Sequence, residues 1–494
     1  MKRASGILMH ISSLPSPYGI GTFGKEAYRF VDFLNQAGQR YWQILPIGPT
    51  SYGDSPYQSY STFAGNPYFV DLGLLREQKL LTAQELSQPV WGGNPEAVDF
   101  SALEKHRFTV LHRAFSRFDQ TMPGFLKFCK KQGWWLSDYA LYMALKGQNG
   151  GKGWMEWDKG LRLRKPAALV AAREELRSEC CFWAFVQYEF FTQWSKLKKY
   201  AAEKGIKIVG DIPIYVALDS ADVWANRELF QLDKDGRPIE VSGCPPDAFS
   251  ATGQLWGNPL YRWGRHKKDG YKWWMRRIQA ASERYDVTRI DHFRGFDSYY
   301  AIPYGDETAE NGRWRRGPGW DFFKTLQRTL GDVPIIAEDL GYLTDSVRKL
   351  LKKTGYPGMK VLQFAFDSRE ESDYLPHNYD KNCVVYTGTH DNDTIDGWFH
   401  TIPEEDAAFC RDYLRLNEAE GYHWGFIKGA WASVGDTAIA QMQDFLNLDT
   451  SARMNTPSTV GCNWKWRLTP GVLDVALAQK IRHITKLYGR LEEK

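Results

Sequence analysis

The chain has 494 residues, and its 63 Lys and Arg against 59 Asp and Glu give a formal net charge of only +4. This weak imbalance disfavours nucleic-acid binding, which usually requires a pronounced basic stripe. A hydrophobic content of 43% with 25% charged residues is typical of a globular protein and excludes a disordered one. At about 150 residues per domain the length allows three domains, but a single elaborated barrel also reaches this size.

No segment predicts export or membrane insertion. The apolar stretch after Met1 is too short for a signal peptide, and no run of about 18 apolar residues occurs. The seven cysteines are odd in number and scattered, without a CxxC motif, and the ten histidines form neither HExxH nor a cluster at ligand spacing. We therefore expect a reduced, cytoplasmic protein without a metal site.

Aromatic residues make up 15% of the chain, with 20 Trp, 26 Tyr and 27 Phe. These rings have flat apolar faces, and Trp and Tyr also have a polar edge. A sugar ring has an apolar C–H face bordered by hydroxyl groups, so aromatic rings suit it as stacking partners. We expect most individual rings to belong to the core, but the composition also favours a carbohydrate ligand.

Short apolar or β-branched runs recur along the chain and predict strands at 6–11, 41–47, 206–210, 287–290, 333–337, 359–366 and 383–386. A weaker eighth candidate lies near 453–460. Helical periodicity separates several of these runs: Ala27, Phe30, Val31 and Leu34 share one helix face, with Gly38 as the stop signal. Eight strands alternating with helices predict an α/β fold, a (β/α)₈ TIM barrel.

The spacing of the predicted strands is uneven. We expect residues 1–494 to form one catalytic barrel with two large insertions above its C-terminal face. The first, 48–205, is predicted to be a helical, aromatic-rich subdomain, and the second, 216–285, a flap and helices that cover a cleft. Within the second, the basic stretch 262–277 contains Trp273, Trp274 and Met275, which indicates an amphipathic helix rather than a nucleic-acid site.

Carboxylates follow four of the predicted strands, at Asp211, Asp291, Glu338 and Asp391, and His390 precedes the last of them. Catalytic groups of such barrels lie where the strands end at the C-terminal face. One Asp after a strand is most often a helix cap. Four carboxylates at separate strand ends, joined by an arginine and a histidine, indicate an active site.

The local spacing suggests roles for two of these carboxylates. Arg289 and Asp291 are two residues apart and project from the same face of a strand, so the guanidinium can hold Asp291 ionised, as a nucleophile must be. Glu338 ends the most apolar strand, where loss of hydration would keep it protonated as a general acid. Such a pair, about 5–5.5 Å apart, makes a retaining glycosidase-type mechanism plausible. The alternative for Arg289 and Asp291 is a structural ion pair at the barrel rim.

Longer motifs make the chain resemble the 4-α-glucanotransferases of glycoside hydrolase family 77, within the α-amylase clan of barrels. The resemblance runs nearly end to end. The motifs are GILMHISSLP at 6–15, GDSPYQS at 53–59, AGNPY at 64–68, GQLWGNP at 253–259, RIDHFRG at 289–295, PGMKVLQF at 357–364 and WKWR at 464–467.

The resemblance implies that Asp291 is the nucleophile, Glu338 the acid/base and Asp391 the stabiliser of the transition state. It also implies a set of substrate-binding residues: Tyr57, Asp211, Arg289 and His390 at the donor sugar, Phe249, Gln254 and Trp256 on the acceptor side, and Ser55 and Asn463. The segment 244–258 resembles the family's flap over the cleft. Ala248 and Ser458 differ from the residues that are frequent at these positions in the family. These differences bear on the acceptor geometry that the resemblance implies and leave the implied reaction class unchanged.

The implied activity is transfer of a segment of an α-1,4-glucan to the 4-hydroxyl of glucose or of another α-1,4-glucan, with retained configuration. Maltooligosaccharides and α-1,4-glucans are the implied partners, without metal, organic cofactor, nucleic acid or membrane, and the protein is expected to be a monomer or homodimer. Two alternatives remain at this point: a retaining α-glucan hydrolase of the same clan, and a catalytically silent glucan-binding protein.

Overall fold

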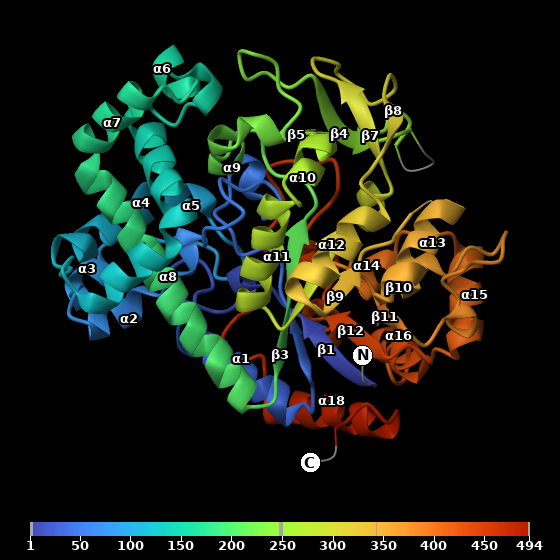
Figure 1. Ribbon diagram of the computed structural model, residues 1–494. Helices are drawn as coiled ribbons and strands as arrows, with labels where there is room; N and C mark the ends of the chain where they lie inside the picture. The colour runs from blue at the N-terminus through green and yellow to red at the C-terminus, as the bar shows by residue number, and fades with distance from the viewer. Residues whose placement is uncertain (1–2, 247–249, 342, 493–494) are drawn as a thin grey trace.

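A computed structural model describes residues 3–246, 250–341 and 343–492. Its main sheet has eight parallel strands in the order β10-β11-β12-β1-β2-β3-β6-β9, so each strand pairs with the next barrel strand along the chain. The strands are β1 (Ala4–Leu8), β2 (Tyr41–Gln43), β3 (Lys207–Pro213), β6 (Val287–Asp291), β9 (Ile335–Ala337), β10 (Gly358–Val361), β11 (Cys383–Tyr386) and β12 (Thr437–Gln441). The Ala337 N–H donates to the Pro357 carbonyl at 3.0 Å and joins the two ends of the sheet. The predicted TIM barrel is therefore confirmed (Figure 1).

Seven of the predicted strand runs overlap barrel strands, but the eighth prediction is wrong. Residues 453–460 form no strand, and the eighth strand is β12, which lies between β11 and β1. Its sequence, TAIAQ, has small and polar residues that give a weak apolar signal, although all five are buried. Tertiary burial between two neighbouring strands, rather than local propensity, makes this segment a strand.

Helices cover the outside of the barrel. The predicted helix near 27–34 is α1 (Lys25–Gln36), and the chain leaves it through Gly38 at φ 68°, a conformation that favours glycine. A second predicted helix, α13 (Asp345–Thr354), begins after Thr344 and ends at Gly355 at φ 73°. The other helices after β6 are α12 (Trp320–Leu330), α14 (Ile395–Phe399), α15 (Glu404–Leu414), α16 (Tyr422–Ala432), α17 (Met442–Phe445) and α18 (Val475–Leu487).

The connection from β2 to β3 is largely helical. It contains α2 (Leu72–Glu77), α3 (Ala83–Ser87), α4 (Phe100–Ser116), α5 (Pro123–Gln148), α6 (Lys159–Arg162), α7 (Pro166–Glu175) and α8 (Arg177–Glu203). These helices gather on the left of the view in Figure 1. No helix in the described part of the chain is long and apolar enough to cross a membrane. The boundaries 48–205 and 216–285 stay predictions.

A second, antiparallel sheet lies at the upper right of the view in Figure 1. Its order is β5-β4-β7-β8, formed by β4 (Glu240–Cys244), β5 (Gln254–Pro259), β7 (Ser298–Pro303) and β8 (Arg313–Arg316). The sequence did not predict this sheet, because it joins the β4–β5 pair, which precedes β6, to β7 and β8, which follow β6. The same β3–β6 connection contains α9 (Ala221–Ala225), α10 (Trp263–Lys268) and α11 (Lys272–Arg284), and α11 buries Trp273, Trp274 and Met275.

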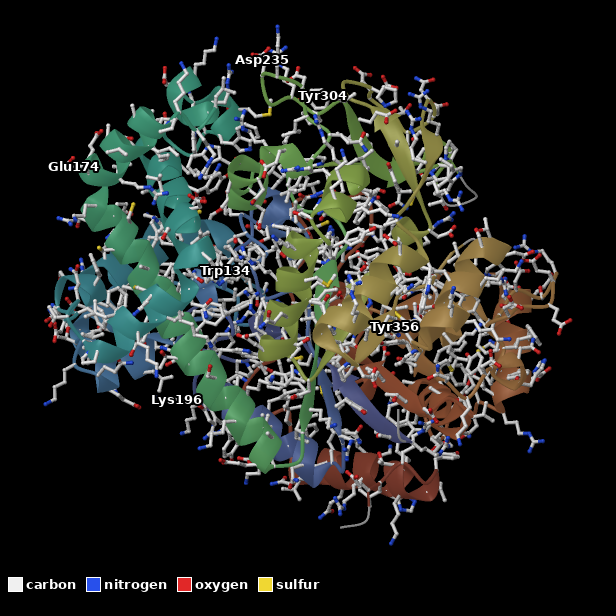
Figure 2. All side chains as sticks on the ribbon, in the orientation of Figure 1. Trp134, Glu174, Lys196, Asp235, Tyr304 and Tyr356 are labelled. Atoms are coloured by element: carbon white, nitrogen blue, oxygen red, sulfur yellow. The ribbon has the colours of Figure 1, made fainter. Side chains whose placement is uncertain are left out.

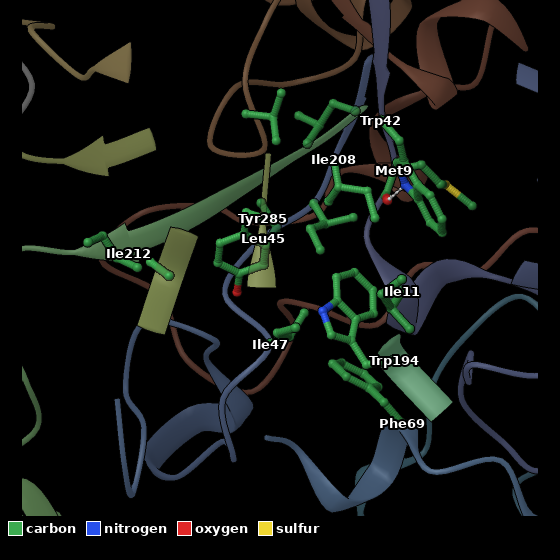
Figure 3. Packing of buried hydrophobic residues seen from close by; sticks show 14 of the residues in the cluster. Met9, Ile11, Trp42, Leu45, Ile47, Phe69, Trp194, Ile208, Ile212 and Tyr285 are labelled. Atoms are coloured by element: carbon green, nitrogen blue, oxygen red, sulfur yellow. Dashed lines mark hydrogen bonds between the residues drawn. The ribbon is translucent and has the colours of Figure 1, made fainter. Parts of the chain in front are cut away.

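Most of the aromatic side chains belong to the core, as expected. Figure 3 shows Trp42 and Trp194 among aliphatic side chains of the barrel, with the Trp42 Nε1–H donating to the Met9 carbonyl at 2.7 Å. Buried polar edges of Trp usually find such a partner. The abundance of tryptophan is therefore mainly a property of packing, and single rings near the barrel mouth must be considered one by one.

Candidate active site

Three neighbouring strands bring Asp211, Arg289, Asp291 and Glu338 together. In the β3–β6 ladder Asp211 lies opposite Arg289, and Pro213 lies opposite Asp291. Glu338 follows β9 directly, and its N–H donates to the Ile290 carbonyl at 3.0 Å. Because these strands are parallel, their carboxyl ends meet at one face of the barrel. The convergence expected from the strand ends is present for these four side chains.

Arg289 joins two of the carboxylates. Its Nη1 lies 2.6 Å from Asp211 Oδ2 and its Nη2 lies 3.0 Å from Asp291 Oδ1. The Arg289 and Asp211 side chains are 4% and 0% exposed, whereas that of Asp291 is 29% exposed. Asp291 is thus held by a buried cation while its own side chain stays partly exposed. A purely structural ion pair does not require this exposure.

Asp211 has an unusual environment for a carboxylate. Burial raises its pKa to about 7, although Arg289 opposes the shift. The Tyr57 hydroxyl donates to its Oδ2 at 2.9 Å, but its Oδ1 is buried and has no hydrogen-bond partner among the described residues. A buried acceptor without a partner is destabilising. Asp211 therefore offers an acceptor to a ligand hydroxyl.

Glu338 is held by two backbone amides. The His292 N–H donates to Oε2 and the Leu340 N–H to Oε1, both at 2.7 Å. His292 has a φ of 55°, an uncommon left-handed conformation for a residue other than glycine, in the turn after β6. Burial, reinforced by the charge of Asp291, raises the pKa of Glu338 to about 7. At and below this pH the carboxyl can donate a proton.

Asp391 is held differently, in the loop that follows β11. Its Oδ1 accepts a hydrogen bond from Asn455 Nδ2 at 2.6 Å, and its backbone carbonyl accepts one from Arg453 Nη2 at 2.6 Å. Its side chain is 45% exposed. Sequence reasoning missed Asn455 and Arg453, because residues 453–460 were predicted to be a strand and no motif links them to Asp391.

Tyr57 and His390 form one stacked unit. Their rings lie 5.1 Å apart at 11°, and Trp464 lies 5.9 Å from each. Burial lowers the pKa of His390, so the imidazole is neutral at physiological pH. One face of the Tyr57 ring is therefore occupied within the protein, and its hydroxyl is directed to Asp211.

The small sheet brings Trp256 to the turn that holds Glu338. The Trp256 ring meets the His292 ring edge-on at 4.9 Å and 87°, and its Nε1–H donates to Gln254 Oε1 at 3.1 Å. Phe249, predicted on the acceptor side, lies outside the described residues. Strand β5 therefore contacts the turn after β6 directly.

Ser55 and Asn463 have local contacts. The Ser55 hydroxyl accepts the Tyr57 N–H at 3.2 Å, which orients the loop that holds Tyr57. The Asn463 amide donates to the Thr459 carbonyl at 2.9 Å and accepts the Thr456 N–H at 3.0 Å, closing the loop after Asn455. In this structure both residues shape loops at the barrel mouth.

The fold and this cluster define a barrel enzyme of glycosidic-bond chemistry, with carboxylates gathered at the strand ends. Residues 9–474 match the model of the family described as 4-alpha-glucanotransferase, glycoside hydrolase family 77. The chain belongs to this family, and the resemblance inferred from its motifs is confirmed. Among the described residues no group of three or more His, Cys, Asp or Glu is placed to hold a metal ion.

Relatives match over almost the whole chain. A 4-alpha-glucanotransferase of Clostridium butyricum is 52% identical, covering 98% of this chain and 100% of the relative, and one of Thermus thermophilus is 47% identical, covering 99% and 100%. The solved structure of amylomaltase from Streptococcus agalactiae in complex with acarbose is 43% identical, with a TM-score of 0.97 over 99% of this chain and 100% of that one.

Proposed function

We propose that the protein transfers segments of α-1,4-glucans to the 4-hydroxyl of glucose or of another α-1,4-glucan by a retaining double displacement. Family membership supports the 4-α-glucanotransferase activity. The observation that carries the mechanism is the pairing of Asp291, held by Arg289, with Glu338, whose pKa is raised to about 7. A carboxylate paired with a buried guanidinium, together with a second carboxyl whose pKa is raised, is the arrangement that a retaining mechanism needs.

In the first half-reaction Glu338 protonates the glycosidic oxygen while an Asp291 oxygen attacks the anomeric carbon. The bond to the leaving glucan breaks, and a β-linked glucosyl ester forms on Asp291. As Asp291 loses its negative charge, Arg289 remains paired with Asp211, so the cation is never left alone in a buried site. The leaving fragment carries away the proton from Glu338.

In the second half-reaction Glu338, now ionised, removes the proton from the 4-hydroxyl of an incoming glucan. That oxygen attacks the anomeric carbon from the face opposite to Asp291, the ester bond to Asp291 breaks and releases its carboxylate, and the α configuration is restored. Asp391 accepts hydrogen bonds from ring hydroxyls that strengthen as charge develops. We assign Asp211 Oδ1, His390 and the Tyr57 hydroxyl to the same donor sugar.

Transfer requires that an acceptor glucan displace water at the glucosyl ester. We propose that Trp256 stacks the acceptor and shields the intermediate, with Gln254 beside it; the contact of its ring with His292 supports this. We propose that Phe249 belongs to the same acceptor side, and that Ser55 and Asn463 act by shaping the loops around it. The retaining α-glucan hydrolase is the second candidate, and it differs in this step only.

Substrate class and setting complete the proposal. We propose maltooligosaccharides and α-1,4-glucans as donors and acceptors, a cytoplasmic location and a monomeric or homodimeric state. The solved Streptococcus agalactiae relative is in complex with acarbose. This supports a sugar-like ligand for the present chain.

The test is to incubate the pure protein with maltotriose alone and to separate the products over time. We expect a ladder of longer maltodextrins with released glucose and little gain in total reducing ends. A steady gain in reducing ends with only shorter sugars would instead establish a hydrolase. Absence of both products would leave the glucan-binding alternative.

A further inference from the structure

One tryptophan at the edge of the small sheet is both exposed and firmly held. Trp314 lies in β8, the edge strand of this sheet, and is 42% exposed, whereas most tryptophans of the chain are buried. Tyr304, labelled at the top of the view in Figure 2, begins the loop that leads from β7 to β8. A single exposed ring is common on protein surfaces, but this one differs in how it is held and in what lies beside it.

Two side chains fix the orientation of the Trp314 ring. The Arg294 guanidinium lies over the ring, 4.0 Å from its centroid, which is a close cation–π contact. The Tyr300 ring, opposite Trp314 in the β7–β8 ladder, meets it edge-on at 5.3 Å and 64°. Tyr300 is itself buried, and its hydroxyl donates to the Ala309 carbonyl at 3.1 Å. Because the ring is held before any ligand arrives, stacking on it costs little conformational entropy.

Arg294 also connects Trp314 to the turn after β6. It follows His292 by two residues, and the His292 N–H donates to Glu338 Oε2 at 2.7 Å. Burial, reinforced by the charge of Arg294, lowers the pKa of His292 to about 3. The guanidinium that lies over the Trp314 ring is therefore close to the His292 ring as well, and the same His292 ring contacts Trp256 at 4.9 Å.

Backbone hydrogen bonds tie both ends of β8 to the same side of the barrel mouth. Before β8, the Ala309 N–H donates to the Thr252 carbonyl at 3.0 Å, and Thr252 belongs to the segment 244–258 that resembles the family's flap. After β8, the Gly317 N–H donates to the carbonyl of Asp297, which ends the turn after β6, at 2.7 Å. The strand that holds the exposed ring is thus joined both to the flap segment and to this turn.

Most of the cations near Trp314 are engaged within the protein. Of the three arginines of β8, Arg313 and Arg315 are paired with Glu240 at 3.0 and 2.9 Å, and Arg294 lies over the ring. The aromatic face, rather than a cluster of cations, is therefore what β8 presents to a ligand. Such a flat apolar face suits the C–H face of a neutral sugar ring.

We propose that Trp314 is a distal acceptor-side contact, on which one sugar ring of a long α-glucan stacks beyond the flap segment and the turn after β6. The identity of the ligand as an α-glucan rests on the proposed function. The contact acts only on chains long enough to reach Trp314 from the catalytic carboxylates. It therefore selects for acceptor length and takes no part in the chemical step.

The test compares acceptors of increasing length with a single donor. The donor is isotope-labelled α-maltosyl fluoride, because fluoride leaves the acceptor side empty, and mass spectrometry counts the labelled maltosyl groups transferred to glucose, maltotriose or maltoheptaose. Trp314→Ala should raise the apparent KM for maltoheptaose about 3–10-fold, the range of one lost ring contact, and leave the KM for glucose unchanged. Trp314→Phe keeps an aromatic face and should behave nearly as the wild type.

Trp134→Ala is the matched control. Trp134 is 43% exposed and has the Arg276 guanidinium 5.2 Å from its ring centroid, but it lies on α5 (Figure 2). Its loss should leave the KM for every acceptor unchanged. The proposal is overturned if Trp314→Ala leaves the KM for maltoheptaose unchanged or raises the KM for glucose equally. It is also overturned if Trp134→Ala produces the same selective change.

Calorimetry separates this proposal from the proposed function, because binding does not require turnover. In the Asp291→Asn background, Trp314→Ala should weaken the binding of maltoheptaose about 3–10-fold and leave that of maltose unchanged. If transfer products are absent but this selective loss occurs, the proposed function fails and the contact at Trp314 stands. If transfer occurs and the affinity for maltoheptaose does not depend on Trp314, the proposed function stands and the distal contact is excluded.

Discussion

Two regions of the barrel mouth hold carboxylates by different means. Asp211, Asp291 and Glu338 sit on or directly after three paired strands, and their positions follow from the backbone ladder. Asp391 sits in a loop and is held by the Asn455 amide and the Arg453 guanidinium, side chains distant along the chain. The first region is mostly buried, whereas the Asp391 side chain is 45% exposed.

The difference fits the roles that we propose for each region. A nucleophile and an acid must keep a fixed separation through both half-reactions, and strands provide this rigidity. A group that grips ring hydroxyls must let each new glucan enter and leave, and a loop braced by side chains permits this. We therefore expect changes in the strand region to abolish chemistry, and changes in the loop region to weaken it.

The largest effect is expected for Asp291→Asn. Loss of the attacking oxygen should lower kcat for maltotriose disproportionation about 10⁴-fold or more, as removal of a nucleophile does elsewhere. Binding of maltoheptaose, measured by calorimetry, should persist. Asp345→Asn, an exposed aspartate in the first turn of α13, is the matched control and should retain full activity. More than a tenth of the activity in Asp291→Asn would exclude the nucleophilic role.

Glu338→Gln should lower kcat about 10²–10⁴-fold, the range of a lost general acid. The defect should be much smaller in the first step with α-maltosyl fluoride, because fluoride leaves without a proton. Single-turnover release of fluoride measures this step. Equal losses on maltotriose and on the fluoride would contradict the assignment of Glu338 as acid.

The pH profile should fall on the alkaline side. Because burial raises the pKa of Glu338 to about 7, its carboxyl is neutral below this pH and ionised above it. The first step needs the neutral form, so kcat/KM for maltotriose should decrease about tenfold per pH unit above pH 7. A profile that stays level to pH 9 would show that Glu338 does not limit this step.

In the loop region Asn455→Ala should lower kcat about 10–100-fold, since hydrogen bonds to charged groups contribute about 1.5–3 kcal/mol. KM should change little if Asp391 acts mainly in the transition state. Arg453→Lys, which keeps the charge but loses the guanidinium that bridges the Asp391 and Asn455 carbonyls, should give a smaller loss. A normal kcat in Asn455→Ala would show that the hydrogen bond from Asn455 is not needed to position Asp391.

The smallest effect is expected for Trp256→Ala, which should change total turnover about 2–10-fold, as loss of one ring contact predicts. Its signature is a shift from transfer to hydrolysis, measured as reducing ends formed per glucose released. Trp134→Ala is the control, because this exposed tryptophan lies on α5, apart from the small sheet (Figure 2). An unchanged ratio would remove Trp256 from the acceptor side.

Much of the strand region could be predicted from the sequence. Strands alternate faces with period two and end at one face of a parallel barrel, so Arg289, Asp291 and Glu338 could be placed together from their positions in apolar runs. Seven strands were found in this way. The TAIAQ strand was not, because small residues carry little apolar signal and its burial depends on the two strands beside it.

The loop region was decided by the tertiary structure. The Asn455–Asp391 bond, the Tyr57–His390 stack and the pairing of β4 with β7 join residues far apart in the chain, within segments that have no periodicity. The sequence by itself determined the barrel, the strand-borne carboxylates and the family. Which side chains hold Asp391 and which strand contacts His292 was decided only by the tertiary structure, because these contacts depend on distances between loops that the closed barrel fixes.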